Sequence, residues 1–274
     1  MSQLAIVGLT ARDRIDGGAP SIGGAPYFGV QALREVGAST LAVTKLAERD
    51  VALLEPLASK PEELVWRASS ETAAYTLTHD PTGGERRVTI DSLGEPWNAD
   101  RDEAWVLPAL AGRAAVHAGA LSAADFPADW LALLARGRRL SFDGQGLVRP
   151  SRIGPVTLEF PDSLDALEHV DVLKLSAEEA EVLGIEPTPE SMRGLTVPEV
   201  VLTAGADGAW IYADGALAEI EVEPTAVTDT TGAGDGFIAC YLHARIEGAS
   251  GADAGAFAAR AVAAMLQKRV VHGH

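Results

Sequence analysis

Cysteine and basic residues are scarce in this chain of 274 residues. Cys240 is the only cysteine, so no disulfide can form within the chain, and a reducing, cytoplasmic location is expected. Lys and Arg number 22 against 39 Asp and Glu, which gives a net charge of −17. This charge disfavours non-specific binding to nucleic acids or anionic membranes, although a local site can still hold one phosphate-bearing substrate.

Targeting signals and long apolar runs are also lacking. The chain begins Met-Ser-Gln-Leu-Ala-Ile-Val-Gly, without the basic start and long apolar stretch of a signal peptide. No apolar run is long enough to span a membrane. With 47% hydrophobic residues, the chain can bury a large core, and its length allows one or two domains. We therefore expect an intracellular globular protein.

Short apolar runs alternate with helical stretches along the chain. The expected strands are 4–8, 40–44, 115–119, 139–143, 171–175, 200–204 and 209–212. The expected helices are 27–36, 102–111, 129–135, 177–183, 233–246 and 252–267. This alternation predicts an α/β fold with a largely parallel sheet.

Residues 71–93 break this rhythm. Polar and apolar residues alternate on both sides of the turn sequence from Asp80 to Gly84. Such a pattern predicts a β-hairpin. Inside an α/β chain, a hairpin of this kind forms either a lid over a site or an edge addition to the sheet.

The strongest chemical signal is the segment from Asp229 to Phe237, Asp-Thr-Thr-Gly-Ala-Gly-Asp-Gly-Phe, which opens an apolar helix. Its small residues let a ligand approach the backbone, and amides at a helix N-terminus form an anion site. Asp235 would repel a bound anion, which suggests a base that accepts a proton from an attacking hydroxyl. Alternatively, Asp229 or Asp235 caps the helix. A dinucleotide fingerprint fails because Phe237 occupies its sixth position, so a dehydrogenase is not favoured, and no Walker A loop is present.

Five segments, taken in order, resemble the ribokinase/PfkB family of carbohydrate kinases. They cover nearly the whole chain and are Ile6–Gly8 with Asp13, Gly23–Pro26, Lys174–Glu181, Val201–Ala209 and Asp229–Asp235. The resemblance implies a three-layer α/β sandwich with a mostly parallel central sheet and a small β lid. It also implies one domain over residues 1–274, with the lid formed by about 8–16, 40–46 and 71–93.

The resemblance implies a role for each matching residue of the catalytic segment. Asp235 would be the general base, and the amides of Gly232, Ala233 and Gly234 would form the anion hole for the transferring phosphoryl group. A monovalent cation, K⁺, is a further candidate near Asp229. ATP is the donor that the family implies.

The resemblance also assigns residues to the metal, nucleotide and acceptor. Glu179 would act on the water shell of Mg²⁺, unless it is solvated helix surface. The acceptor hydroxyls would be held by Asp13, Gly23 and Gly24. The nucleotide site would be lined by Lys174, Thr203, Gly205 and Gly208, although the two glycines would also suit a simple turn.

Departures from the family pattern concern the acceptor. Phe28 stands where the family often has an asparagine after the glycine pair, and Asn98 is the only asparagine in the chain. An aromatic ring offers stacking surface and few hydrogen bonds, which weakens the case for ribose or fructose. Alternatively, Phe28 is an ordinary core residue of its helix.

Two further departures lie in the second half of the chain. Ser176 replaces the asparagine of an Asn-x-x-Glu segment, and Gln145 replaces that of Asp-Pro-Asn-x-Arg. Arg149, at the end of the latter segment, either reaches phosphate or lies on the surface. The variant Asp-x-Gln-Gly-x-x-Arg resembles the inositol-kinase-like branches of the family.

These observations predict an ATP-dependent kinase that phosphorylates a hydroxyl group of a small polyol: a sugar, an inositol or a nucleoside. The alternative is a regulatory module that binds nucleotide or sugar on the same fold and has weak catalysis. An intact base beside an anion hole speaks against that alternative. The protein is expected to be a monomer or a homodimer formed through the lid.

Overall fold

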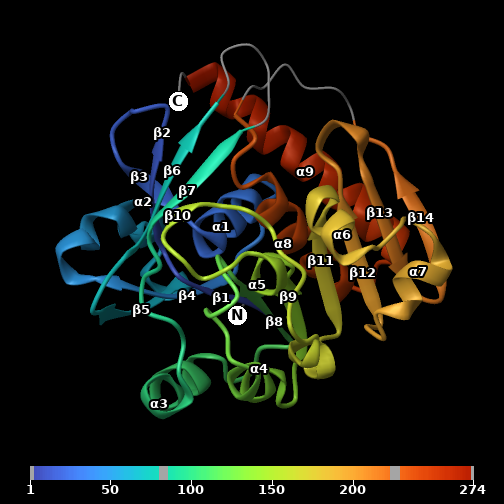
Figure 1. Ribbon diagram of the computed structural model, residues 1–274, viewed down its shortest axis with the longest axis horizontal. Helices are drawn as coiled ribbons and strands as arrows, with labels where there is room; N and C mark the ends of the chain where they lie inside the picture. Colours follow the sequence, from blue (N-terminus) through green and yellow to red (C-terminus); the bar gives the residue numbers. More distant parts are fainter. Residues whose placement is uncertain (1–2, 80–85, 223–228, 273–274) are drawn as a thin grey trace.

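Two β-sheets organise the chain in the computed structural model, which describes residues 3–79, 86–222 and 229–272 (Figure 1). Within these residues the larger sheet has nine strands and the smaller has five. In spatial order the larger sheet contains β14 (Ala216–Ile220), β13 (Ala209–Ala213), β12 (Glu199–Thr203), β11 (Val172–Ser176), β9 (Arg139–Asp143), β8 (Ala115–Gly119), β1 (Leu4–Gly8), β4 (Leu41–Ala47) and β5 (Leu64–Ser69). The smaller contains β10 (Gly154–Pro155), β7 (Arg87–Ser92), β6 (Ala73–Thr78), β2 (Ala11–Ile15) and β3 (Ser21–Gly23).

The larger sheet is parallel from β5 to β12, and β13 and β14 complete one edge in antiparallel pairing. All five residues of β1 are buried, as are the first four of β11 and β12. Strands covered on both faces need continuous apolar runs, which explains why these segments were visible in the sequence. The predicted α/β fold with a largely parallel sheet is confirmed.

Helices cover both faces of the larger sheet. One face carries α1 (Ala25–Glu35), α8 (Ala233–Ile246) and α9 (Gly251–His272); the other carries α3 (Ala99–Ala109), α4 (Ala128–Ala135), α6 (Ala177–Leu183) and α7 (Pro189–Gly194). Alternate residues of β1 serve the two layers: Ile6 packs with Phe237 of α8, whereas Val7 belongs to the core around Trp130 of α4. The result is the three-layer sandwich that was expected. None of these helices is long and apolar enough to cross a bilayer.

The smaller sheet stands to one side of the larger one and forms the lid (Figure 1). β6 and β7 pair in antiparallel fashion, so the expected hairpin strands within 71–93 are present. The expected turn at 80–84 lies outside the described residues. β2, from the expected segment 8–16, pairs in parallel with β6 and antiparallel with β3. Glycine and proline of β10 extend the lid beyond β7.

The prediction that residues 40–46 belong to the lid was wrong. All seven residues of β4 are buried, and the strand lies in the larger sheet between β1 and β5. Its one charged side chain, Lys45, is neutralised by an ion pair of 2.8 Å between its Nζ and Asp102 Oδ2. An apolar strand covered on both faces suits a central position and not a solvent-facing lid.

Candidate active site

The N-terminus of α8 and the carboxyl ends of β9 and β11 converge with residues from the lid. Asp235, in the first turn of α8, interacts electrostatically with Asp143, Lys174, Arg149 and Asp13. In open α/β sheets, ligands bind at the carboxyl ends of the strands. The structure thus gathers side chains from distant parts of the chain at the place where such folds bind ligands.

The segment that opens α8 has a backbone conformation that only glycine adopts easily. Gly232 is the N-cap and has φ 77°. A Cβ atom built on it would lie 2.1 Å from Cγ of Phe28, so this close approach excludes a side chain. The Thr231 amide donates to Asp229 Oδ1 at 2.9 Å and tightens the same turn. Amides in the first turn of a helix have no partner within the helix, so they can face an anion.

The predicted anion hole differs in one detail from its expected form. The amide of Ala233 donates to the carbonyl of Thr230 at 3.0 Å, so this amide already has an acceptor. Gly234 lies against Lys174, whose Nζ would be 3.1 Å from a Cβ atom built on the glycine. An ammonium group therefore stands directly beside the N-terminus of α8.

Desolvation and the neighbouring Asp143 charge raise the pKa of Asp235 to about 7, against the opposing charges of Lys174 and Arg149. A carboxylate with a pKa near neutrality is a far better proton acceptor than an ordinary aspartate. This raised pKa is compatible with the predicted general base, and the role of Asp235 stays a prediction.

Lys174 lies among three carboxylates. Its Nζ is 3.6 Å from Asp143 Oδ1 and 4.0 Å from Glu179 Oε2, and the Asp235 charge also raises its pKa. Asp143 is fully buried, and within the described residues its Oδ2 has no hydrogen-bond partner. Three carboxylates around one ammonium leave this cluster with excess negative charge. A further cation would relieve that excess.

Glu179 is a buried residue and not solvated helix surface. Its Oε2 accepts a hydrogen bond of 2.8 Å from the Ser176 amide, and Ser176 Oγ accepts one of 3.2 Å from the Glu179 amide. This reciprocal pair caps α6. Serine at position 176 is therefore explained by capping, and the Glu179 carboxylate lies in the cluster around Lys174.

The acceptor-side residues lie where the lid meets α1. The carboxylate of Asp13 rests on Gly23, so close that a Cβ atom there would be 1.9 Å from Oδ2. Burial raises the pKa of Asp13 to about 7, while the charges of Arg86 and Arg149 act in the opposite direction. Gly24, with φ 94°, is the N-cap of α1. Asp13 and Asp235 influence each other's charge, so the two predicted acceptor-binding and catalytic carboxylates share one site.

Phe28 was predicted either to line the acceptor pocket or to be an ordinary core residue of its helix, and its position has features of both. It is buried with 7% exposure, and its ring lies directly against Gly232. The centroid of the Tyr27 ring is 5.0 Å away. The ring therefore supports the predicted catalytic turn, Asp229–Gly232, from the α1 side.

Gln145 and Arg149 follow β9 in the expected segment. The backbone amide of Gln145 donates to Asp143 Oδ1 at 3.1 Å. Arg149 Nη1 donates to the Leu121 carbonyl at 3.3 Å, and its guanidinium lies 6.0 Å from the centre of the Tyr75 ring. Arg149 also acts on the charges of Asp13 and Asp235, so it belongs to the site and not to an isolated surface.

The proposed nucleotide residues lie one strand further along the sheet. Thr203 pairs with Ser176 across β12 and β11, and its Oγ1 donates to the Leu175 carbonyl at 3.2 Å. Gly205 and Gly208 have φ values of 56° and 94°, and a Cβ atom on Gly208 would lie 2.3 Å from the Ile220 carbonyl oxygen. The turn itself thus requires both glycines, and their part in nucleotide binding stays a prediction.

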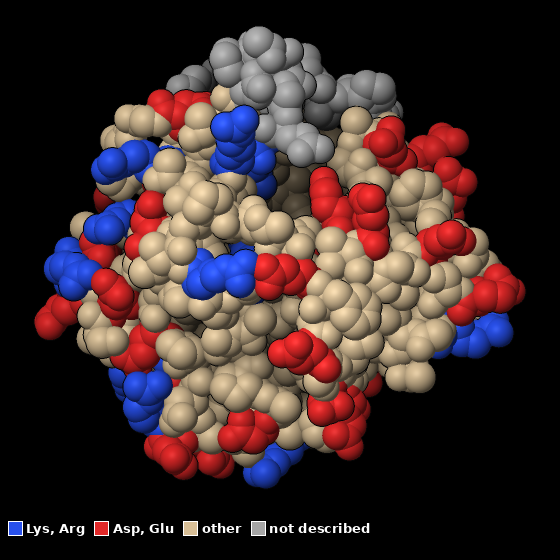
Figure 2. Space-filling model, viewed as in Figure 1, with Lys and Arg blue, Asp and Glu red and all other residues tan. Residues whose placement is uncertain are grey.

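Sequence reasoning missed Arg86 and gave Thr231 and Asp143 no role. Arg86 Nη1 donates to Thr231 Oγ1 at 3.0 Å across 145 positions of the chain. Figure 2 shows the face concerned, where a hollow has Lys or Arg side chains at one margin and Asp or Glu side chains at the other. In the described part of the chain, no group of three or more His, Cys, Asp or Glu side chains is arranged to hold a metal by itself.

The structure thus combines an α/β sandwich and a β lid with a helix N-terminus that carries a partly exposed carboxylate beside a lysine ammonium. Residues 54–272 match the model of the pfkB family of carbohydrate kinases, and the chain belongs to this family. The family predicted from the sequence is therefore confirmed.

Individual relatives agree with this assignment. The chain is 35% identical over 114 residues to an inositol 3-kinase of Zea mays; the match covers 42% of this chain and 27% of the maize protein. Among solved structures, a pyrophosphate-dependent kinase in the ribokinase family, complexed with a pyrophosphate analog and myo-inositol, is 25% identical with a TM-score of 0.81. That likeness covers 96% of this chain and 94% of the other. A ribokinase of Arabidopsis thaliana, complexed with ribose and ATP, shares the fold at 19% identity with a TM-score of 0.69, covering 96% and 92%.

Proposed function

We propose that this protein transfers a phosphoryl group to a hydroxyl of a cyclic polyol of the inositol class. The observation that carries the proposal is the position of Asp235, a partly exposed carboxylate with a pKa of about 7 in the first turn of α8, whose charge interacts with that of Asp13. The likeness to an inositol 3-kinase and to a kinase complexed with myo-inositol supports the inositol class over other polyols.

In the proposed reaction, Asp13 orients the acceptor and Asp235 accepts the proton of the attacking hydroxyl. The oxygen forms a bond to the terminal phosphorus as the bond from phosphorus to the donor's bridging oxygen breaks. The amides at the start of α8 and the ammonium of Lys174 stabilise the charge on the phosphoryl oxygens. The lid strands exclude water, which limits transfer to water in place of the acceptor.

The proposed donor is ATP, with Thr203, Gly205 and Gly208 lining its site. A ribokinase complexed with ATP has the same fold, which supports this donor. Inorganic pyrophosphate is the second candidate, because the solved structures at 25% identity and TM-score 0.81 are those of a pyrophosphate-dependent kinase. Lys174 beside the α8 amides would serve either donor, since both present a terminal phosphoryl group.

A divalent cation fits the carboxylate cluster. Asp143 Oδ2 is buried without a partner among the described residues, and carboxylate oxygens are ligands that Mg²⁺ accepts. Asp143, with Glu179 acting through water, would hold Mg²⁺, which neutralises phosphate charge when it is bound with the donor. The monovalent cation near Asp229 stays a prediction.

The test is donor cleavage measured across a panel of inositols, sugars and nucleosides. Each acceptor is supplied with Mg–ATP or with Mg–pyrophosphate, and Asp235→Asn is the control. Turnover on an inositol that disappears in the variant supports the proposal. Turnover only on a sugar or nucleoside overturns the inositol class. Donor binding without turnover on any acceptor favours the alternative function, a regulatory binding module.

A further inference from the structure

Arg86 joins the lid to the catalytic turn. It directly precedes β7, and its Nη1 donates to Thr231 Oγ1 at 3.0 Å. Thr231 precedes Gly232, the N-cap of α8. A guanidinium that begins in the lid thus ends beside the amides that face the phosphoryl group in the proposed reaction.

The guanidinium groups of Arg86 and Arg149 interact electrostatically with each other. Arg86 is an exposed residue, yet desolvation of its guanidinium lowers its pKa, and the charge of Arg149 lowers it further; Asp229 and Asp13 act in the opposite direction. Among the residues that the structure describes, neither arginine has a carboxylate oxygen within 4.0 Å. Neighbouring cations without a direct counter-ion favour an anion between them.

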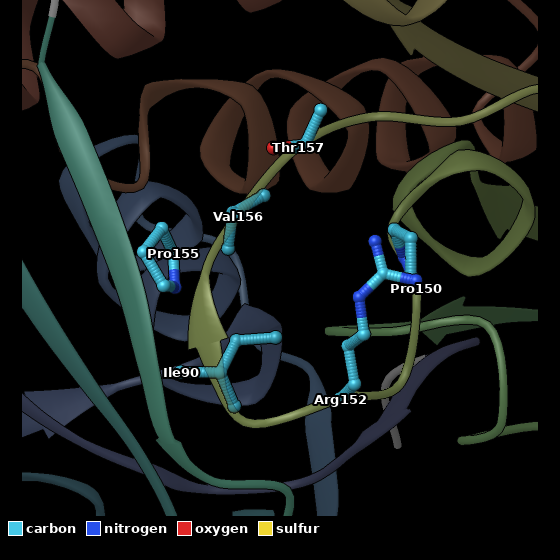
Figure 3. Close-up of a pocket in the computed structure, with 6 residues that line it drawn as sticks. All are labelled: Ile90, Pro150, Arg152, Pro155, Val156 and Thr157. Atoms are coloured by element: carbon cyan, nitrogen blue, oxygen red, sulfur yellow. The ribbon is translucent and has the colours of Figure 1, made fainter.

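The lid and the Arg149 segment are connected by hydrogen bonds. After Arg149 the chain passes through Pro150 to β10, where Gly154 pairs with Ile90 of β7 and the Val156 amide donates to the Val88 carbonyl at 2.9 Å. Figure 3 shows Pro155 and Val156 beside Ile90, across a narrow crevice from Pro150. The two arginines therefore belong to segments that are joined by strand pairing.

We propose that Arg86 is a catalytic residue that reaches from the lid and binds the transferring phosphoryl group beside the amides of α8. This inference rests on the proposed phosphoryl transfer. The planar guanidinium can donate hydrogen bonds to two phosphoryl oxygens at once. The Thr231 hydroxyl holds the side chain in position before the donor binds. As the acceptor oxygen bonds to phosphorus and the donor oxygen leaves, negative charge on the phosphoryl oxygens faces Arg86, and the proton goes to Asp235.

The chain supplies a matched control, because Arg87 follows Arg86 and is exposed on β7. We expect Arg86→Gln to lower kcat about a hundredfold, with the KM of the acceptor changed only a few-fold, because the lost contact acts on the phosphoryl group. Arg86→Lys should recover about tenfold of this loss, since lysine restores the charge but cannot donate two parallel hydrogen bonds. Arg87→Gln should leave kcat unchanged. Equal kcat values for Arg86→Gln and Arg87→Gln would overturn the proposal.

Titration calorimetry with Mg–pyrophosphate and Mg–ATP separates this inference from the proposed function. Weaker donor binding in Arg86→Gln than in Arg87→Gln, in a protein that phosphorylates no acceptor, would refute the kinase reaction and retain the phosphoryl contact. Turnover that survives unchanged in Arg86→Gln would retain the reaction and refute the contact. Thermal melting of each variant shows that the folded protein is being compared.

Discussion

Two buried clusters of charges lie at opposite ends of the same parallel strands. At the amino ends, the carboxylate of Glu199 in β12 accepts a hydrogen bond of 2.7 Å from the Tyr241 hydroxyl and forms ion pairs with Arg139 and Arg245. At the carboxyl ends, the ammonium of Lys174 stands 3.6 and 4.0 Å from two carboxylates. The first cluster thus has one carboxylate with two close cations, whereas the second has one cation among several carboxylates.

The contrast separates an arrangement that stabilises the fold from one that awaits a ligand. The first cluster is complete in the protein alone, because each oxygen of Glu199 has a donor. The second retains an Asp143 Oδ2 that has no hydrogen-bond partner among the described residues, and its Asp235 has a raised pKa. Charge that is left unbalanced in a buried site costs stability, and binding of donor and metal would recover it.

Breaking the complete cluster should have the largest effect. Glu199→Gln leaves Arg139 without its counter-ion and Arg245 with Asp214 alone, so we expect a loss of about 3 kcal/mol in the free energy of unfolding. Chemical denaturation measures this loss, while kcat of the folded enzyme should not change. Glu219→Gln, on the exposed face of β14, is the control and should unfold like the wild type. A loss of kcat without a loss of stability would reverse the roles assigned to the two clusters.

Removing the proposed base, Asp235, from the second cluster should lower the activity without lowering the stability. Asp235→Asn should lower kcat about a hundredfold or more and change ATP affinity by only a few-fold. Because a carboxylate beside Asp143 is removed, the melting temperature should be unchanged or higher at pH 8. Near-normal turnover in this variant would refute the assignment of the base.

The pH dependence follows from the same raised pKa values. The rate should rise about tenfold per pH unit below pH 7 and level off above it, because Asp235 acts only when ionised. For stability the sign is reversed. Asp13 and Asp235 bind protons more tightly in the folded protein than when unfolded, so stability should fall as pH rises from about 4 to about 7. Denaturation at pH 5 and pH 8 measures this fall, and a flatter profile is expected for Asp235→Asn. A rate that is independent of pH between 5 and 7 would contradict the assignment.

The smallest effect concerns the metal. Glu179→Gln keeps an acceptor for the Ser176 amide and removes a charge, so α6 should remain capped. We expect the Mg²⁺ concentration for half-maximal rate to rise about fivefold, because one carboxylate no longer acts on the metal's water shell. Glu181→Gln, an exposed position of the same helix, is the control. An unchanged Mg²⁺ requirement would limit Glu179 to holding Lys174.

Much of the large sheet was predictable because buried parallel strands leave continuous apolar runs. The lid was harder, since its strands are short and their partners are far apart in sequence: β2 pairs with β6, and β10 with β7. β4 was misplaced because the strand's own residues do not record that β1 and β5 flank it.

The candidate site shows the same limit at the level of single residues. The Asp229–Asp235 segment was visible because its spacing is local. Arg86 was missed because Arg87 beside it is of the same residue type, so the sequence does not single out either arginine. Only the partner Thr231, 145 positions away, distinguishes the two arginines.

The contact between Phe28 and Gly232 has a consequence for how the protein matures. The two residues are about 200 positions apart, and closing so long a separation is slow compared with forming local contacts. On the ribosome, α1 is made before α8 and must wait until about 200 further residues have been added. The turn that precedes α8 therefore gains its supporting ring only after α8 has emerged, so chains that stop earlier carry the predicted acceptor residues without an assembled centre.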